Sequence, residues 1–499
     1  MPSAPPNATA SDQGSGAIKA LGLTSSTTIV MGVMIGSGIF VVSPQISRQV
    51  GSPAMLMLVW TLTGIMTMMG ALCYGELAAA MPQAGGQYVY LREAFNPLFG
   101  FLYGWTSFVV IQTGTIAAVC VAFAKYLGVI YPGWISETNW LFHLGHIGPV
   151  QLGVNTEELV AIAVIVFLTW LNSRGVKAGA LVQNVFTFAK IAALVGLILI
   201  GLVIARNAGV ISANFSHFWS QFWAGIFSSG SYNLTGAANG SLVSTATIVA
   251  VFAAMVGSLF SSDAWNNITF TAGEVQNPRR NLPLSLALGT ITVTAIYLLT
   301  NLAYLSVLRF ADIAAAPEDR VASAMLAVLY GHTGAVLIAA AILISTFGCT
   351  NGLILAGARI YYAMAHDGLF FKGVARLNPA RVPARGLWIQ GLWACLLCLS
   401  GKYNDLLNYV MFAVFLFYIL TIAGLFILRY RQPNLARPYK VIGYPVLPAV
   451  YILLAIFFDV VVLWVFPQYA GGGLLLVLLG VPVFYIWRAS GRKGLATTL

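Results

Sequence analysis

Hydrophobic residues fill most of this chain in long runs that short polar segments separate. A helix of about 20 apolar residues crosses a bilayer, so the pattern predicts an all-α polytopic membrane protein with 12 transmembrane helices, numbered here as spans 1 to 12. The third and eighth runs are long enough that we expect strong tilt or protrusion. The runs cover residues 22–42, 52–75, 97–127, 157–172, 180–205, 245–273, 284–308, 333–363, 386–400, 405–428, 446–466 and 471–487.

Composition and charge support this class. Hydrophobic residues make up 59% of the 499 residues and charged residues 8%, whereas soluble domains carry about 25% charged residues. The net charge of +11 does not indicate a nucleic-acid partner, because the basic residues flank apolar runs. With the N-terminus in the cytoplasm, 18 of the 25 lysines and arginines fall on the inner side. The positive-inside rule therefore predicts two cytoplasmic termini, and we expect a multi-pass protein of the cell membrane.

Span 1 contains a helix-breaking sequence at its centre. Gly36, Ser37 and Gly38 interrupt the run VMIGSGIFVV, and glycine is about 1 kcal/mol worse than alanine in a helix. We predict that the helix unwinds here, exposing backbone N–H groups at the positive end of a half-helix. Such groups favour an anion, for example a carboxylate. The alternative is a small-residue seam for close helix packing.

Span 6 contains a second interruption, the polar cluster Ser261, Ser262, Asp263, Asn266 and Asn267. An acidic residue within a span costs at least about 2.5 kcal/mol, so this segment fits a water-accessible cavity better than lipid. Spans 1 and 6 are five spans apart, and an odd offset requires an inverted repeat. Paired broken spans in inverted halves are typical of secondary transporters. Freed carbonyls near Phe260 would accept an ammonium group, so the two breaks together favour a zwitterion, an amino acid.

Lys190 is the one basic residue that falls on neither side of the membrane in this topology. Span 5 begins near Leu181, and nine residues of helix cover roughly 14 Å, close to half of a 30 Å bilayer core. A lysine at that depth costs several kcal/mol unless it faces the bundle interior. One reading is a structural ammonium bonded to freed carbonyls of span 1. The other is a coupling cation in the place of a sodium ion.

Five stretches, which include both interruptions and Lys190, resemble the amino acid–polyamine–organocation (APC) superfamily, and most closely its L-type amino acid transporter branch with the bacterial relatives. The similar stretches are GVMIGSGIFVVSP (32–44), ALCYGELAAAMPQAGGQYVYLREAF (71–95), NSRGVKAGALVQNVFTFAK (172–190), FSSDAWNNITFTAGEVQNPRRNLP (260–283) and FGCTNGLILAGARIYYAMAHDG (347–368). The second stretch also contains a short element at 78–95 that we expect to be interfacial or re-entrant.

The resemblance implies a leucine-transporter-like fold, a 5+5 inverted repeat plus two extra helices. The predicted parts are a cytoplasmic N-terminal tail (1–20), the first repeat (21–206), an extracellular loop (207–244), the second repeat (245–430), spans 11 and 12 (431–488) and a cytoplasmic tail (489–499). The implied function is secondary transport of amino acids by alternating access. We expect neutral L-amino acids, with exchange or proton coupling; a polyamine or another small amine is the alternative substrate.

The resemblance also implies the binding residues. Ile35, Gly36, Ser37 and Gly38 would hold the substrate carboxylate. Phe260, Ser261, Ser262, Asp263 and Ala264 would line the amine and side-chain side, with Phe260 as an aromatic gate. Span 10 is apolar over YVMFAVFLFY (409–418), which predicts an apolar side-chain pocket. Lys190 matches the position where sodium-coupled relatives bind sodium, which predicts sodium independence.

Further polar residues lie within or next to the predicted spans. Ser345, Thr346 and Asn351 either face the first break or serve as helix–helix contacts. Glu76 is expected to pair with a basic loop residue. We expect no metal site at His143 and His146, which lack further ligands nearby, and no cofactor. The outer segment 128–156 has no cysteine, so we expect no disulfide-linked heavy chain, unlike many eukaryotic L-type members.

The sequence lacks the signals of two other functional classes. A polytopic membrane enzyme would need catalytic motifs such as HExxH or GxSxG, or paired intramembrane carboxylates, and the sequence has none. A channel or receptor would need a continuous set of pore-lining polar groups, whereas the sequence offers one compact polar cluster.

Overall fold

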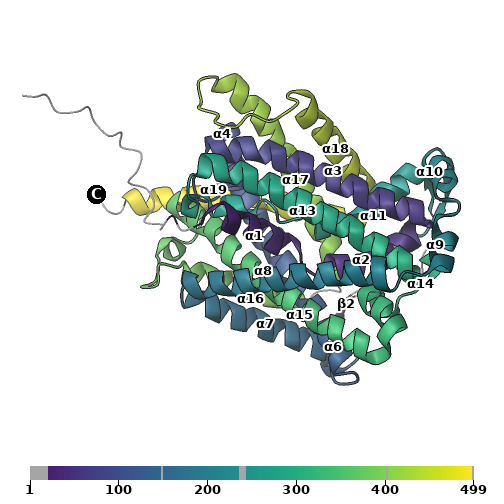
Figure 1. Ribbon diagram of the computed structural model, residues 1–499. Coiled ribbons are helices and arrows are strands. Elements are labelled where there is room, and N and C mark those ends of the chain that lie inside the picture. The colour runs from purple at the N-terminus through teal and green to yellow at the C-terminus, as the bar shows by residue number, and fades with distance from the viewer. Residues whose placement is uncertain (1–18, 20, 148–149, 235–242, 400–402, 497–499) are drawn as a thin grey trace, which may run out of the picture.

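Helices form over all twelve predicted apolar runs in the computed structural model, which describes residues 19, 21–147, 150–234, 243–399 and 403–496. Figure 1 shows these helices packed side by side in one bundle, with α1 and α2 inside it. Of the predicted tails, only Lys19 and residues 489–496 belong to the described part of the chain.

The helices of the first half are α1 (Leu23–Met34), α2 (Gly38–Val50), α3 (Pro53–Ala80), α4 (Gln87–Ala94), α5 (Pro97–Thr106), α6 (Gln112–Ile130), α7 (Thr156–Ser173), α8 (Val176–Leu199), α9 (Ala208–Phe215) and α10 (Phe218–Ile226). Those of the second half are α11 (Thr247–Ser261), α12 (Asn267–Phe270), α13 (Pro278–Val307), α14 (Phe310–Ala314), α15 (Val321–His366), α16 (Ala384–Cys398), α17 (Tyr403–Arg431), α18 (Val446–Val465) and α19 (Pro467–Ala496). A π-helical turn, Ser107–Ile111, joins α5 to α6.

Among the described residues, nine helices are long and apolar enough to cross a membrane, and α1 with α2 makes a tenth if the bent pair counts as one span. The helices over runs 6 and 9, α11 and α16, have only 15 residues each. A helix of that length covers roughly 22 Å, less than a bilayer core. The protein is therefore polytopic and helical, while the count of 12 and the inverted repeat stay predictions.

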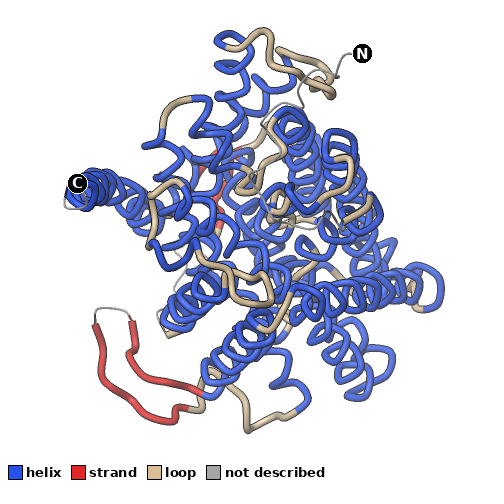
Figure 2. Tube along the Cα trace, turned by 90° about the vertical axis from the view of Figure 1, so that its left-hand side faces the viewer, coloured by secondary structure: helices blue, strands red, loops and turns tan. Residues whose placement is uncertain are grey.

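Short strands occupy the long connections between helices. Strands β1 (Trp140–Ile147) and β2 (Val150–Asn155) pair antiparallel, and Figure 2 shows this hairpin extending away from the helical body. The predicted extracellular loop contains α9, α10 and β3 (Ser229–Tyr232). Strand β3 pairs antiparallel with β4 (Val243–Ala246).

Side-chain caps fix where several helices begin. Asn155 accepts a hydrogen bond from the Glu158 N–H and the Glu158 carboxylate accepts one from the Asn155 N–H, a complete capping box at the start of α7. Ser52 caps α3, where Pro53 fills the first helical position. These local signals agree with the ends of the apolar runs.

Within the segment 78–95, α3 ends at Ala80 and the buried helix α4 begins at Gln87 and contacts α5 and α17. Gly86, at φ +48°, precedes it, and a Cβ there would lie 2.2 Å from the Thr269 hydroxyl oxygen. Only glycine permits this approach and this conformation. The burial of Tyr88 and Leu91 fits the re-entrant alternative rather than an interfacial helix.

Glu76 is paired as predicted. Its carboxylate accepts hydrogen bonds from the Arg429 side chain at 2.5 Å and 2.8 Å and from the Val441 N–H at 2.7 Å, and Arg437 lies 3.5 Å away. A buried carboxylate is tolerated when its oxygens are fully satisfied in this way. The network joins the end of α3 to α17 and to the loop after it.

Candidate substrate site

The first predicted break is present. α1 ends at Met34, α2 begins at Gly38, and their axes differ by 43°. A Cβ on Gly38 would lie 1.9 Å from the Ser261 hydroxyl oxygen, so glycine lets α2 pack directly against α11. This close contact is what the packing-seam alternative expects, and it occurs together with the helix break.

The second predicted break is also present. α11 ends at Ser261, and the four-residue helix α12 begins at Asn267. Between them Ala264 adopts φ +64°, a left-handed conformation that is unfavourable for any residue with a Cβ. The Asp263 carboxylate accepts a hydrogen bond of 2.6 Å from the Tyr418 hydroxyl on α17.

Lys190 of α8 lies against the first break with its side chain fully buried. Its ammonium donates hydrogen bonds to the carbonyl oxygens of Gly32, at 2.7 Å, and Ile35, at 2.8 Å. No ion pair to Lys190 occurs among the described residues. The carbonyl end of α1 therefore stabilises its charge, the contact that the structural reading predicted.

Residues of α15 satisfy neighbouring carbonyl groups. The Ser345 hydroxyl lies 3.4 Å from the Ile35 oxygen and 3.3 Å from the Gly36 oxygen, and the Cys349 thiol lies 3.1 Å from the Val33 oxygen. Thr346 instead bonds within its own helix. Of the three possible residues predicted from α15, Ser345 thus contacts the break.

Asn351, the third of those residues, is a helix–helix contact. Its side-chain oxygen accepts a hydrogen bond of 2.8 Å from the Asn172 amide on α7. This is the packing role that was the alternative for these polar residues.

Tyr297 of α13 connects the two breaks. Its hydroxyl lies 3.1 Å from the Met34 carbonyl oxygen, at the end of α1, and 3.0 Å from the Ser261 carbonyl oxygen, at the end of α11. Its ring packs edge-on against Trp60. The single hydroxyl proton is therefore shared between the carbonyl ends of two broken helices.

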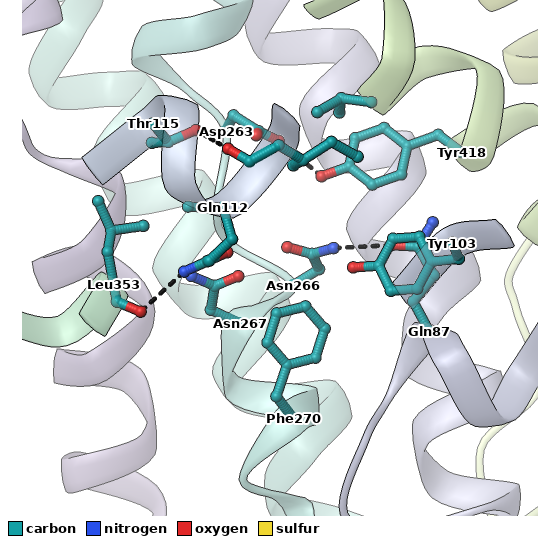
Figure 3. Close-up of a pocket in the computed structure, with 13 residues that line it drawn as sticks. Gln87, Tyr103, Gln112, Thr115, Asp263, Asn266, Asn267, Phe270, Leu353 and Tyr418 are labelled. Carbon is teal, nitrogen blue, oxygen red and sulfur yellow. Dashed lines mark hydrogen bonds between the residues drawn. The ribbon is translucent and has the colours of Figure 1, made fainter. Parts of the chain in front are cut away.

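A polar cavity lies beside the second break (Figure 3). Asp263 and Ala264 line it together with Asn266, Asn267 and Phe270. The other walls come from α4, α5, α6, the π-helical turn, α15 and α17: Gln87, Tyr103, Ile111, Gln112, Thr115, Leu353, Val414 and Tyr418.

Most polar groups of this cavity are held by protein partners. Asn266 donates to the Gln87 side chain at 3.0 Å, and Gln112 donates to the Leu353 carbonyl oxygen at 2.8 Å (Figure 3). The buried Asn267 amide nitrogen has no partner among the described residues. It remains available to an acceptor group on a ligand.

Of the nine predicted binding residues, Asp263 and Ala264 line this cavity, and the other seven do not. The backbone at Ile35–Gly38 is covered: a Cβ on Gly36 would lie 3.1 Å from the Cys349 sulfur. Phe260, Ser261 and Ser262 are buried where α11 ends. In this conformation the two breaks pack together instead of enclosing an open space.

The cavity also differs from the apolar pocket that span 10 predicted. Span 10 contributes Val414 and Tyr418. Tyr418 is the last residue of the apolar run 409–418, and its hydroxyl donates a hydrogen bond to Asp263. The other polar groups come from Gln87, Gln112 and Thr115. The prediction missed these residues, although a glutamine inside the apolar run 97–127 was a visible signal.

Two further residues of α8 were missed. Gln183, Thr187 and Lys190 follow one face of that helix, and a Cβ on Gly32 of α1 would lie 2.2 Å from the Thr187 hydroxyl oxygen. The side-chain polar atoms of Gln183 and Thr187 are buried without hydrogen-bond partners among the described residues. Such groups are normally satisfied by water in a protein interior.

The sequence profile of the amino acid permease family matches residues 21–482. The chain belongs to the amino acid permease family. It is 31% identical over 445 residues to the Homo sapiens b(0,+)-type amino acid transporter 1, and the aligned region covers 88% of this chain and 81% of that protein. It is 30% identical over 489 residues to the Mus musculus large neutral amino acids transporter small subunit 2, covering 96% and 83%.

Membership confirms the resemblance inferred from the motifs. This amino acid permease is a membrane transport protein rather than an enzyme, which removes the enzymatic alternative. The second relative is named as a small subunit.

Proposed function

We propose that this permease is a secondary active transporter that moves amino acids across the cell membrane by alternating access, with both termini in the cytoplasm. In this proposal α11 with α12 forms span 6 and α16 forms span 9, which gives 12 spans and a 5+5 inverted repeat plus two. The observation that carries the proposal is the meeting of two broken helices at Gly38 and Ser261, next to a polar cavity.

The breaks supply groups of opposite polarity for a zwitterion. N–H groups at the start of a helix have no intrahelical acceptor, so the start of α2 favours the substrate carboxylate. Carbonyl groups at the end of α11 favour its ammonium group. Because Gly38 and Ser261 are in contact here, a substrate enters only after α2 and α11 separate, and its side chain then extends toward the cavity at Asp263.

A pair of backbone hydrogen bonds, called the strap below, joins the chain before α1 to the segment after α12. Leu21, before α1, exchanges hydrogen bonds with the segment after α12: its N–H donates to the Glu274 oxygen at 3.0 Å and its oxygen accepts from the Gln276 N–H at 2.8 Å. The Glu274 carboxylate in turn binds Arg359 of α15 at 2.7 Å. We propose that this strap closes the cytoplasmic side and releases when that side opens.

Lys190 supports sodium independence. Its ammonium occupies the Gly32 and Ile35 carbonyl oxygens, which are hard oxygen ligands of the type that alkali cations use. A resident cation leaves these oxygens unavailable to sodium. Without sodium, transport is driven either by exchange for another amino acid or by coupling to a proton.

Neutral L-amino acids are the first candidate substrates. A second candidate is an amino acid with a cationic side chain, because the Asp263 carboxylate lines the cavity and has a neutral hydroxyl as its partner. A cationic side chain would neutralise this buried charge.

We also propose that no disulfide-linked heavy chain joins this chain. Segment 128–156 has no cysteine, four of the five cysteines are buried, and the fifth, Cys395, is half-buried within the apolar helix α16. A band that a reducing agent shifts to lower mass on a gel would contradict this.

The test is uptake into liposomes that contain the purified protein, with each of the twenty amino acids, in sodium and in choline buffer. We expect saturable uptake of a subset of amino acids, equal in both buffers, and faster when the same amino acid is present inside. Failure to transport any of the twenty by a folded protein would refute the proposed function. A strong requirement for sodium would refute only the role of Lys190.

A further inference from the structure

An apolar groove runs along the outside of the bundle between α7 and α16, which lie side by side (Figure 1). Leu159, Val166 and Trp170 line it from α7, and Trp388 lines it from α16. These positions of α7 share one helical face, and the two tryptophans are 42% and 44% exposed. None of the residues that line the groove lines the candidate substrate site.

The length of the groove matches one leaflet of a bilayer. Leu159 and Trp170 are separated by eleven helical positions, roughly 16 Å of helix, and half of a bilayer core is about 15 Å. One extended acyl chain therefore fits along it.

Positive charge is concentrated where the groove ends. The Arg174 guanidinium lies 4.6 Å from the centre of the Trp170 ring. Arg381 and Arg385 are exposed on the segment that leads to Trp388, and the Asn378 amide bonds the Ser173 carbonyl oxygen at 2.7 Å, which holds that segment against the end of α7.

The segments that form this end of the groove contain no acidic residue. Neither 159–190 nor 370–399 contains an aspartate or glutamate, and no ion pair to Arg174 occurs between described residues. Guanidinium groups bind phosphate oxygens in a bidentate manner. A zwitterionic headgroup would bring an ammonium group to a site that has no carboxylate to receive it.

We propose that this groove is a binding site for an anionic glycerophospholipid, with one acyl chain between α7 and α16 and the phosphate at Arg174. The bound lipid covers the exposed faces of Trp170 and Trp388 and neutralises Arg174. The site is separate from the transport pathway, so the proposal stands or falls independently of the transported substrate.

The test is native mass spectrometry of the full-length protein in detergent with equal amounts of dioleoyl phosphatidylglycerol and dioleoyl phosphatidylcholine. We expect the wild type to retain more phosphatidylglycerol than phosphatidylcholine. Arg174→Gln should lower phosphatidylglycerol retention about fivefold, since one basic residue contributes about 1 kcal/mol toward an anionic lipid, and should leave phosphatidylcholine retention unchanged. Arg280→Gln, an exposed arginine on α13 away from the groove, is the matched control and should behave as wild type.

A second variant tests the groove itself. Ala163 is exposed on its floor, and Ala163→Phe should fill it and lower the retention of both lipids. Equal retention of the two lipids by the wild type would overturn the proposal. The same holds for unchanged phosphatidylglycerol retention in Arg174→Gln, or for unchanged retention in Ala163→Phe with a wild-type circular dichroism spectrum.

Discussion

The ammonium of Lys190 lies 2.7 Å from the carbonyl oxygen of Gly32, although the two residues are 158 positions apart in the chain. With the second bond to Ile35, this contact holds α8 against the unwound end of α1. The same two carbonyl groups lose their helical partners because of the break, so the cation and the break stabilise each other.

Replacing Lys190 with methionine is expected to reduce amino acid uptake at least tenfold and to lower the melting temperature. The Gly32 carbonyl would be left buried without a donor, and the Ile35 carbonyl would keep only its longer contact with the Ser345 hydroxyl. Each loss of a bond to a charged group costs about 1.5–3 kcal/mol. Uptake into liposomes and thermal unfolding measure both effects. Lys125→Met, near the C-terminal end of α6, is the control, and wild-type uptake by Lys190→Met would refute a functional role.

Tyr297→Phe removes the hydroxyl shared by Met34 and Ser261 and keeps the ring against Trp60. We expect a fall in transport rate of several-fold with a loss of stability of about 1–3 kcal/mol, the cost of a buried unsatisfied carbonyl. Tyr330→Phe, at an exposed tyrosine, should be neutral in both assays. Equal behaviour of the two variants would show that the hydroxyl does not couple the breaks.

Asp263→Asn keeps the size of the side chain and removes its charge. If lysine or arginine is a substrate, its uptake should fall at least tenfold relative to leucine, because a charge-assisted hydrogen bond is about twice as strong as a neutral one. Competition assays against labelled leucine give this ratio. An unchanged ratio would show that Asp263 does not face the substrate side chain, and a wild type that moves neither lysine nor arginine would exclude the cationic candidate.

Ala264→Gly is expected to stabilise the protein. Ala264 has φ +64°, which costs a residue with a Cβ roughly 1–2 kcal/mol, whereas the entropic cost of glycine in the unfolded chain is about 0.4–1 kcal/mol. The melting temperature should rise by about 1–3 °C. Ala287→Gly, inside the regular helix α13, should instead lower it, and a fall for both variants would contradict the strain at Ala264.

The membrane class, both helix breaks and the Glu76 pairing were predictable from single stretches of sequence. Each leaves a local signal: an uncharged run, two glycines around a serine, a carboxylate at the end of a span. The burial of Lys190 beside the first break agrees with its place in the middle of the predicted span 5. Each of these features follows from a single stretch of sequence and from the free-energy cost of placing polar groups in lipid.

The composition of the cavity was not predictable in the same way. Gln87, Gln112 and Tyr418 belong to three different helices, and only the packing of α4, α6 and α17 brings them to Asp263. Tyr297 reads as an apolar residue of span 7, and its role appears only where its hydroxyl meets two carbonyl groups from distant segments. The direct packing of Gly38 on Ser261 likewise depends on the conformation of the whole bundle.

The most direct test of the site is substrate protection of a cysteine placed in the cavity. Thr115 lines the cavity on α6, and Thr115→Cys is close in size. With the protein in liposomes, we predict that a transported amino acid slows alkylation of this cysteine by a small thiol reagent several-fold. Alkylation of a cysteine at Asn207, in the connection after α8, should not change. Equal alkylation rates at position 115 with and without every transported amino acid would contradict a substrate site at the two breaks.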